Sequence, residues 1–206
     1  MWHALTQLAA IAPLFVAASA VVGAAVAVLG YRKWHPEATG KRKIELAEDI
    51  LTGIYEVREV IAWARSPAGF VGEAEGRPRA EDEDPGHAQM RDAYFRTIAR
   101  LEQDKAAFSN LQAKKYRAMA CFGQDAGQPF LELKAPHAQI GTAALSLIRT
   151  WPPHGVHMSA QCRKWEAIIG WGYEPNASDA IQQELEQIIR RFEELFGKSL
   201  LREGAG

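Results

Sequence analysis

The sequence predicts an all-α protein, in which an N-terminal transmembrane helix precedes an antiparallel bundle of about four to five helices. First, no charged side chain occurs from Ala4 to Tyr31. Second, apolar residues recur every three or four positions through the rest of the chain, as they do in amphipathic helices. Third, the alternation of apolar and polar residues that indicates strands is scarce.

The uncharged segment is long enough to cross a bilayer. Leu8 to Leu29 is almost wholly Ala, Val, Leu, Ile and Phe, and a bilayer core requires a helix of about 20 apolar residues. A cleaved signal peptide would place basic residues before a shorter apolar core, and a buried helix of a soluble protein rarely runs this far without a charge. We therefore assign residues 1–31 to a short tail and a transmembrane helix.

A cluster of basic residues follows the uncharged segment and predicts its orientation: Arg32, Lys33, Lys41, Arg42 and Lys43. Because positive charge is retained on the cytoplasmic side, we expect a short N-terminus outside and the C-terminal domain in the cytoplasm. We therefore expect a single-pass protein of the inner (plasma) membrane of the cell. Residues 32–43 are expected to form a basic juxtamembrane hinge around Pro36 and Gly40.

The helical bundle is expected to occupy residues 44–200. Its first helix is predicted to end at Ser66-Pro67, because a residue before proline is disfavoured in a helix. Its apolar stripe is Ile44, Ala47, Ile50, Leu51, Ile54, Val57 and Ile61. Residues 66–86 then form an acidic loop rich in Gly and Pro. Loops of this length are functional or disordered, so the segment is expected to be a flexible connector, with a docking or regulatory role as the alternative.

Three further helices are expected before the last one. The spacing of Tyr94, Leu101 and Leu111 predicts a long helix over 89–122 that stops at Gly123. The next covers about 125–151, with a kink or a split at Pro136. A shorter helix covers about 159–171. Four tryptophans in these helices and in the first one are expected to pack in the core or at helix ends: Trp63, Trp151, Trp165 and Trp171.

The last helix shows the clearest pattern. Ile181, Leu185, Ile188, Phe192 and Leu195 follow the 4-3-4-3 spacing of a bundle seam. Ser178 or Asn176 is expected to cap its start and Gly197 its end. Residues 201–206 are expected to be a flexible tail.

Composition and motifs exclude several classes of function. A net charge of −1 gives no sign of nucleic-acid binding. The two cysteines form no disulfide framework, and no phosphate loop, nucleophile elbow or dinucleotide fingerprint occurs. We therefore expect no enzyme activity, no catalytic residue and no cofactor.

One cluster in the sequence contains residue types that can bind metal ions. His154, His157 and Cys162 carry imidazole and thiol groups suited to zinc or copper. Their spacing matches no established pattern, and a fourth ligand is missing. We therefore expect no metal site.

The predicted transmembrane helix also has a face of small residues. Ser19, Gly23 and Ala27 recur every four residues, and small side chains let two helices approach closely in lipid. Homo-oligomerisation through this face is a further prediction, although an Ala-rich helix produces such spacing by chance in several registers.

Three stretches carry a resemblance to a known group: KRKIELAEDIL, RSPAGF and KYRAMACFGQDAGQPFLEL. They resemble uncharacterised bacterial single-pass membrane proteins with an N-terminal span and a helical cytoplasmic domain. The resemblance implies this architecture and no activity, cofactor or site residue.

Two classes of function therefore stay open. The first is a membrane-anchored interaction or scaffold module, whose partners are the lipid bilayer and a protein not identified by the sequence. The second is an enzyme, or a ligand or metal sensor, whose site is assembled from separate helices. A deep pocket lined by polar side chains would favour the second class, and a filled core with an apolar surface patch the first.

Overall fold

A computed structural model describes the backbone of residues 2–171 and 178–201, and the side chains of these residues except 2–20 and 30–39. Throughout this described part the regular structure is helical, which confirms the all-α prediction. The chain divides into two compact units, Met1–Glu45 and Leu46–Gly206.

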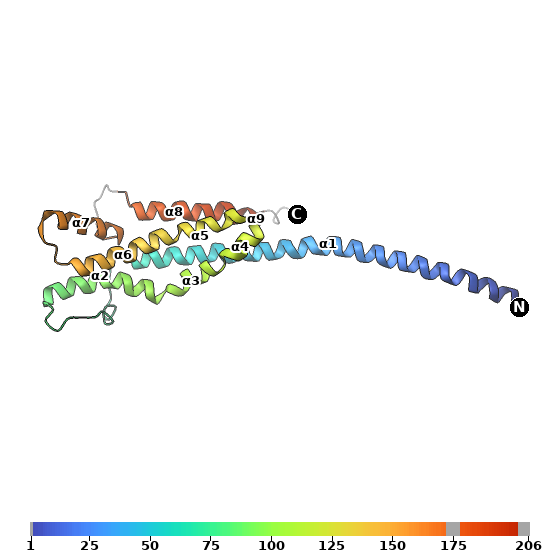
Figure 1. Cartoon of the computed structure of the whole chain (residues 1–206), viewed down its shortest axis with the longest axis horizontal. Helices are drawn as coiled ribbons and strands as arrows, with labels where there is room; N and C mark the ends of the chain where they lie inside the picture. The colour runs from blue at the N-terminus through green and yellow to red at the C-terminus, as the bar shows by residue number, and fades with distance from the viewer. Residues whose placement is uncertain (1, 172–177, 202–206) are drawn as a thin grey trace. The chain divides into compact units, whose positions relative to one another are not determined.

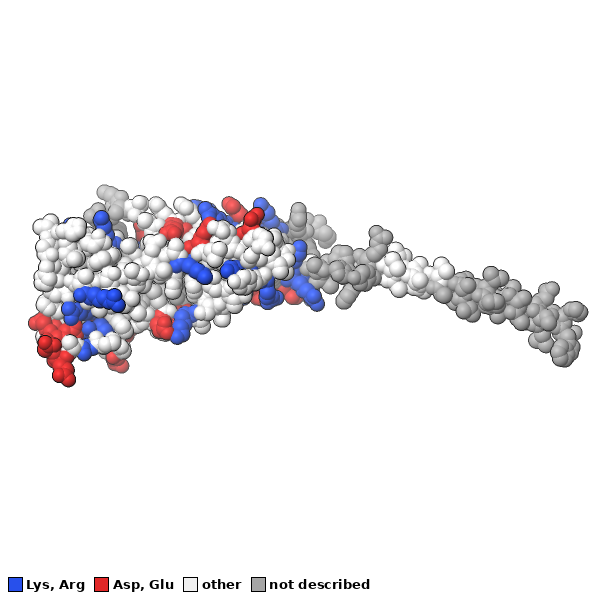
Figure 2. Space-filling view, viewed as in Figure 1, with Lys and Arg blue, Asp and Glu red and all other residues white. Residues whose placement is uncertain are grey.

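The first unit is helical and belongs to α1 (Trp2–Ala64), which continues into the second unit. The helix runs through the predicted hinge at 32–43 instead of ending there. All nine side chains from Val21 to Leu29 are exposed, and this stretch is the white patch among grey atoms in Figure 2, with no charged residue in it.

A search of the described residues finds no helix that combines the length and the apolarity needed to cross a membrane. Of the uncharged segment Ala4 to Tyr31, only Val21 to Leu29 have described side chains. Most of the transmembrane helix predicted within residues 1–31 therefore lies outside the residues whose side chains are described.

The second unit is a bundle. Figure 1 shows the helices α2 to α4, then α5 and α6, and finally α8, running alongside the part of α1 that belongs to this unit. The neighbouring pairs include α2 with α6, α6 with α7, and α5 with α8. The elements are α2 (Pro85–Gln103), α3 (Lys105–Ala113), α4 (Lys115–Phe122), the 3₁₀ turn η1 (Gln124–Gly127), α5 (Gln128–Glu132), α6 (Lys134–Thr150), α7 (Gly155–Ile168), α8 (Ala180–Phe192), the π-helix η2 (Glu193–Gly197) and α9 (Lys198–Leu201).

The apolar stripe of α1 forms the centre of the bundle core, as its spacing predicts. Seven side chains of this helix are at most 2% exposed: Leu46, Ala47, Ile50, Ile54, Val57, Ile61 and Ala64. Burying one such branched side chain contributes about 1.5–3 kcal/mol. Gly53 lies on the same helix, where a Cβ would come within 3.3 Å of Leu111 Cδ1. The glycine therefore allows α1 and α3 to pack closely. This close packing explains why a glycine occurs in a helix that it destabilises.

The prediction of one long helix over 89–122 is wrong, because the structure divides this segment at two places into α2, α3 and α4. The breaks fall at Asp104 and Lys114, and neither is a residue that normally ends a helix. Its start is also earlier than expected. Pro85 occupies the first turn, and the Asp84 carboxylate accepts a hydrogen bond from the His87 amide at 3.0 Å.

The helix predicted over 125–151 is divided as well, into η1, α5 and α6. Pro136 lies in the first turn of α6, where its missing N–H has no partner to lose. The following helix, α7, begins at Gly155 rather than Ser159 and ends at Ile168.

A cluster of aromatic rings joins the end of α8 to α4 and α5. The Phe130 ring meets those of Phe192 and Phe196 edge-on, with centroids 4.9 and 6.2 Å apart. The predicted seam is confirmed as far as Phe192 and then fails, because Leu195 is 37% exposed and Phe196 is fully buried. The π-helix over Glu193–Gly197 causes this shift, since its wider turn changes which side chain faces the core.

Candidate functional site

The predicted topology signal is described only in part. Lys41 and Arg42 are exposed and Lys43 is half-buried, whereas the side chains of Arg32 and Lys33 lie outside the described residues. The orientation that these residues predict stays a prediction.

The predicted pairing face of the N-terminal helix is also partly described. Gly23 and Ala27 are exposed, and a Cβ at Gly23 would meet no atom within 4 Å. The side chain of Ser19 lies outside the described residues. Pairing through this face stays a prediction.

The structure does not gather His154, His157 and Cys162 into one site. His154 and His157 are exposed, whereas Cys162 is buried and its Sγ lies 3.8 Å from Thr150 Oγ1. Among the described residues, no three or more His, Cys, Asp and Glu side chains form a group that could hold a metal ion.

The segment 66–84, here called the connecting loop, is irregular, as predicted, and is attached to α2 by a buried arginine. Arg100 of α2 is 1% exposed. Its guanidinium donates to both carboxylate oxygens of Glu73, each at 2.9 Å. It also donates to three backbone carbonyls, those of Trp63, Ser66 and Ala68, at 2.9, 2.8 and 2.5 Å.

Two further contacts hold this part of the loop. The Arg100 guanidinium carbon lies 4.0 Å from the centroid of the Trp63 ring, which is a cation–π contact. Glu73 also accepts a hydrogen bond from the Phe70 amide at 2.9 Å. The Arg100 guanidinium lowers the pKa of the Glu73 carboxyl below its ordinary value, so the pair is ionised at neutral pH.

A second arginine, Arg77, holds the far end of the connecting loop. It donates to both Glu83 carboxylate oxygens at 3.0 and 2.7 Å, and to Asp92 Oδ1 of α2 at 2.5 Å. Glu83 also accepts from Arg91, which donates to the Trp151 carbonyl as well. These hydrogen bonds, those from Arg77 above all, lower the pKa of Glu83 to about 2. The predicted flexibility of the loop stays a prediction, and the two arginines argue against it.

The connecting loop exposes apolar side chains between Ala68 and Glu73, the two loop positions that flank them and contact Arg100. Phe70 is 66% exposed although its ring packs at 5.8 Å on Trp63, and Val71 is 106% exposed. Glu81 and Asp82, further along the loop, are exposed as well. Figure 2 shows acidic side chains at the end of the bundle where Figure 1 places the start of α2. This surface combines backbone held by hydrogen bonds with exposed apolar and acidic groups.

A buried polar pair lies beneath the start of α2. The Tyr94 hydroxyl is fully buried and donates to Glu166 Oε1 of α7 at 2.6 Å. Burial and this hydrogen bond both raise the pKa of Tyr94. The Tyr94 ring packs against Trp151 and Trp171 at 5.8 and 5.4 Å. These tryptophans and Trp165 pack against the core, as expected from the sequence.

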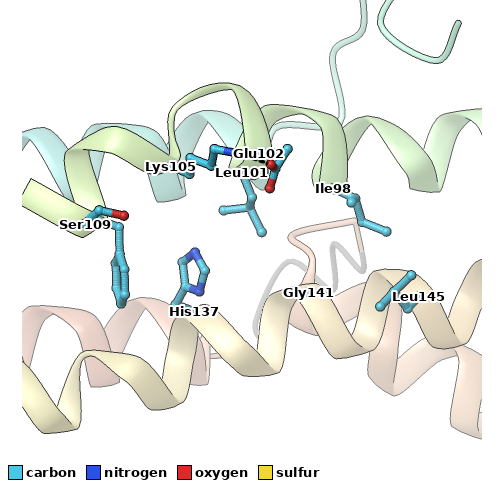
Figure 3. A pocket seen from close by; sticks show the side chains of 9 residues that line it. Ile98, Leu101, Glu102, Lys105, Ser109, His137, Gly141 and Leu145 are labelled. Atoms are coloured by element: carbon cyan, nitrogen blue, oxygen red, sulfur yellow. Dashed lines mark hydrogen bonds and ion pairs between the residues drawn. The ribbon is translucent and has the colours of Figure 1, made fainter. Parts of the chain in front are cut away.

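A groove of about 260 Å³ lies further along α2, between the α2–α3 junction and α6. Figure 3 shows His137 and Gly141 on α6 facing Leu101 and Lys105 across it. The imidazole of His137 stacks on the Phe108 ring with centroids 4.3 Å apart. Burial lowers the pKa of His137, so its ring is neutral at pH 7.

Sequence reasoning named neither the two arginines nor the groove. Arg100 and Arg77 are two of many charged residues on segments read as helix and loop, and no local motif distinguishes them. Gly141 offered one signal, because a glycine within a helical pattern costs about 1 kcal/mol relative to alanine.

The fold and these surfaces define the chain as an all-helical bundle protein with an exposed apolar helical segment. Comparison of the chain with protein-family models finds no match, and comparisons with curated proteins and with solved structures find none either.

Proposed function

We propose that the protein is a membrane-anchored helical module that binds a protein partner on the cytoplasmic side of a bacterial inner membrane. The observation that carries the proposal is the exposure of every side chain from Val21 to Leu29. The neighbouring residues from Ala4 to Tyr31 carry no charge either. A helix that is apolar on all sides is buried in a large core or in a membrane.

The energetics favour a membrane for this segment. Val21, Val22, Val26, Val28 and Leu29 are each 56–69% exposed. Removing such apolar surface from water is worth about 25 cal/mol per Å². The backbone of a helix needs no other partner in lipid, because its hydrogen bonds are internal to the segment.

The basic residues after the segment support the orientation. Arg32, Lys33, Lys41, Arg42 and Lys43 follow the uncharged run, whereas the residues before it include no Lys or Arg. Positive charge beside a transmembrane helix remains in the cytoplasm, which supports a cytoplasmic position of the bundle. The same architecture is implied by the resemblance to bacterial single-pass membrane proteins.

The connecting loop is the surface that we assign to the partner. Arg100 restrains the backbone of this region through its hydrogen bonds to the carbonyls of Trp63, Ser66 and Ala68. A loop that is ordered before binding loses less entropy when a partner covers it. Val71 and Phe70 then supply apolar contacts that the fold itself does not bury. This role requires no catalytic chemistry.

The experiment has two parts, both on the full chain in cells. Carbonate washing of membranes separates anchored from peripheral protein, and reporters fused after Gly206 show the side on which the bundle lies. We expect the chain to stay in the membrane, with only the cytoplasmic reporter active. Release of the chain by carbonate contradicts the anchor, and an active external reporter contradicts the orientation.

The second part uses a photo-crosslinking amino acid at Val71, with Tyr116 as the matched control. Tyr116 is 71% exposed and lies on α4, away from the connecting loop. We expect one discrete crosslinked protein from position 71 and none from position 116. Equal products at both positions, or none at position 71, contradict the assignment of this surface.

A further inference from the structure

The groove between the α2–α3 junction and α6 has features that the packing of the bundle does not require. We propose that it binds an uncharged, mainly apolar small molecule that carries one hydrogen-bonding group. The inference concerns a different surface from the connecting loop and does not depend on the membrane anchor.

The first feature is Gly141, in the interior of α6. A Cβ at this position would meet no atom within 4 Å, so no close approach of another segment requires a glycine. Glycine in a helix interior is destabilising by about 0.5–1 kcal/mol relative to alanine. Its structural effect is to leave the wall of the groove open (Figure 3).

The second feature is the break between α2 and α3. It falls at Asp104, between the lining residues Glu102 and Lys105. Asp is a common residue at the start of a helix because its side chain can cap the first turn, but Asp104 makes no such hydrogen bond. The break therefore lies directly beside the groove without a side-chain cap to stabilise it.

The third feature is the combination of apolar walls with a few polar groups. Ile98, Leu101 and Leu145 line one end of the groove, and Leu145 is 43% exposed. Ser109 and His137 lie toward the other end (Figure 3), where the Phe108 ring stacks on the imidazole. Ligand sites commonly combine apolar walls with a few polar groups that fix orientation.

The charges of the groove select an uncharged ligand. Lys105 and Glu102 form an ion pair with each other, so this edge carries no net charge. The imidazole of His137 is half-buried, and because burial lowers its pKa, the ring is neutral at pH 7 and offers one donor and one acceptor. A volume of about 260 Å³ is just below the range of about 300–1,000 Å³ for drug-sized ligands, which indicates a smaller molecule.

Phenol is a suitable probe, because it has an apolar ring and a single hydroxyl group. We would titrate it into the full chain in detergent micelles and follow the imidazole resonances of His137 by NMR. Gly141→Leu fills the groove, whereas Gln139→Leu adds the same side chain at an exposed position of the same helix. Because all three proteins share the micelle, partition of phenol into detergent affects them equally.

We expect a saturable shift of the His137 resonances both in the wild type and in the control variant Gln139→Leu. In Gly141→Leu the affinity should fall roughly tenfold or more, which corresponds to about 1.4 kcal/mol. A linear, unsaturable response in the wild type overturns the proposal, and so does equal affinity in Gly141→Leu. If circular dichroism shows that Gly141→Leu is unfolded, Gly141→Ala takes its place, and unchanged affinity there overturns the proposal.

Discussion

Two buried arginines hold the connecting loop, and they differ in what neutralises them. Arg100 lies on α2 and donates to one carboxylate, Glu73, and to three backbone carbonyls. Arg77 lies on the loop and donates mainly to two carboxylates, Glu83 and Asp92. Both side chains are almost fully buried, at 2% and 4% exposed.

The difference determines how each end of the loop can be released. A backbone carbonyl cannot be protonated at ordinary pH, so three of the Arg100 contacts persist when Glu73 is neutralised. The Arg77 contacts depend on ionised carboxylates, but these carboxylates have other partners: Glu83 pairs with Arg91 and Asp92 with Arg79. The Arg100 end is thus less sensitive to acid, and the Arg77 end is less sensitive to loss of its arginine.

The largest expected effect comes from removing each arginine in turn. Arg100→Met leaves Glu73 and three carbonyls without their donor, and breaking a buried pair in this way costs about 3–5 kcal/mol. Arg77→Met should cost about 1–3 kcal/mol, because Glu83 and Asp92 keep Arg91 and Arg79. Chemical denaturation of the full chain measures both changes in the free energy of unfolding.

The control for this pair is Arg58→Met. Arg58 is 44% exposed and pairs with Glu59 on the surface, so its loss should change stability by no more than about 0.5 kcal/mol. If Arg100→Met and Arg77→Met lowered the free energy of unfolding equally, the carbonyl contacts of Arg100 would contribute nothing to stability beyond the carboxylate contacts.

Acid should sharpen the comparison with a smaller effect. The pKa of Glu83 is about 2 in the folded protein, against an ordinary value of 4.5. Because the folded pKa is the lower one, its contribution is complete above pH 4.5 and is lost as the pH falls toward 2. Hydrogen exchange at about pH 3, between these two values, should therefore show more opening of residues 77–84 than of residues 66–76. Faster exchange in 66–76 would contradict the role assigned to the carbonyls.

The smallest expected effect is on proteolysis of the native protein. Arg79 is 53% exposed, and the bond after it precedes the exposed residues Ala80, Glu81 and Asp82. Loop segments with little burial are the preferred sites of nicking, so trypsin should cut first after Arg79. Arg77→Lys should accelerate this cut, whereas Arg100→Lys should leave its rate nearly unchanged. A first cut inside α8 would show that the bundle core is misassigned.

The helices of the bundle could be predicted where a local pattern determines them. The stripe of α1 and the seam of α8 as far as Phe192 follow from spacing alone, since the apolar face of a helix must be buried. The breaks at Asp104 and Lys114 could not be predicted, because neither position carries a proline or a glycine and neither side chain makes a capping hydrogen bond.

The surfaces assigned to binding were harder to predict from the sequence than the helices. Arg100 contacts residues 27 to 37 positions away, so the fold must be known before its role is visible. The length and composition of the connecting loop did indicate a docking role as one alternative. The groove at His137 depends on the gap in front of Gly141 and on its position opposite the α2–α3 junction, and neither can be read from the residue types.

The contacts between the end of α1 and the C-terminal helices have a consequence for the order of folding. Arg65, the residue after α1, donates to the Ile168 carbonyl at 2.8 Å and to Asp179 at 2.9 Å, across 103 and 114 residues of chain. The Tyr55 hydroxyl donates to Glu193 across 138 residues. Closing long chain segments costs more entropy than closing short ones, and contacts between distant residues slow folding. We therefore expect α2 and α6 to associate early and the last helices to dock on α1 late, after nearly the whole chain has emerged from the ribosome.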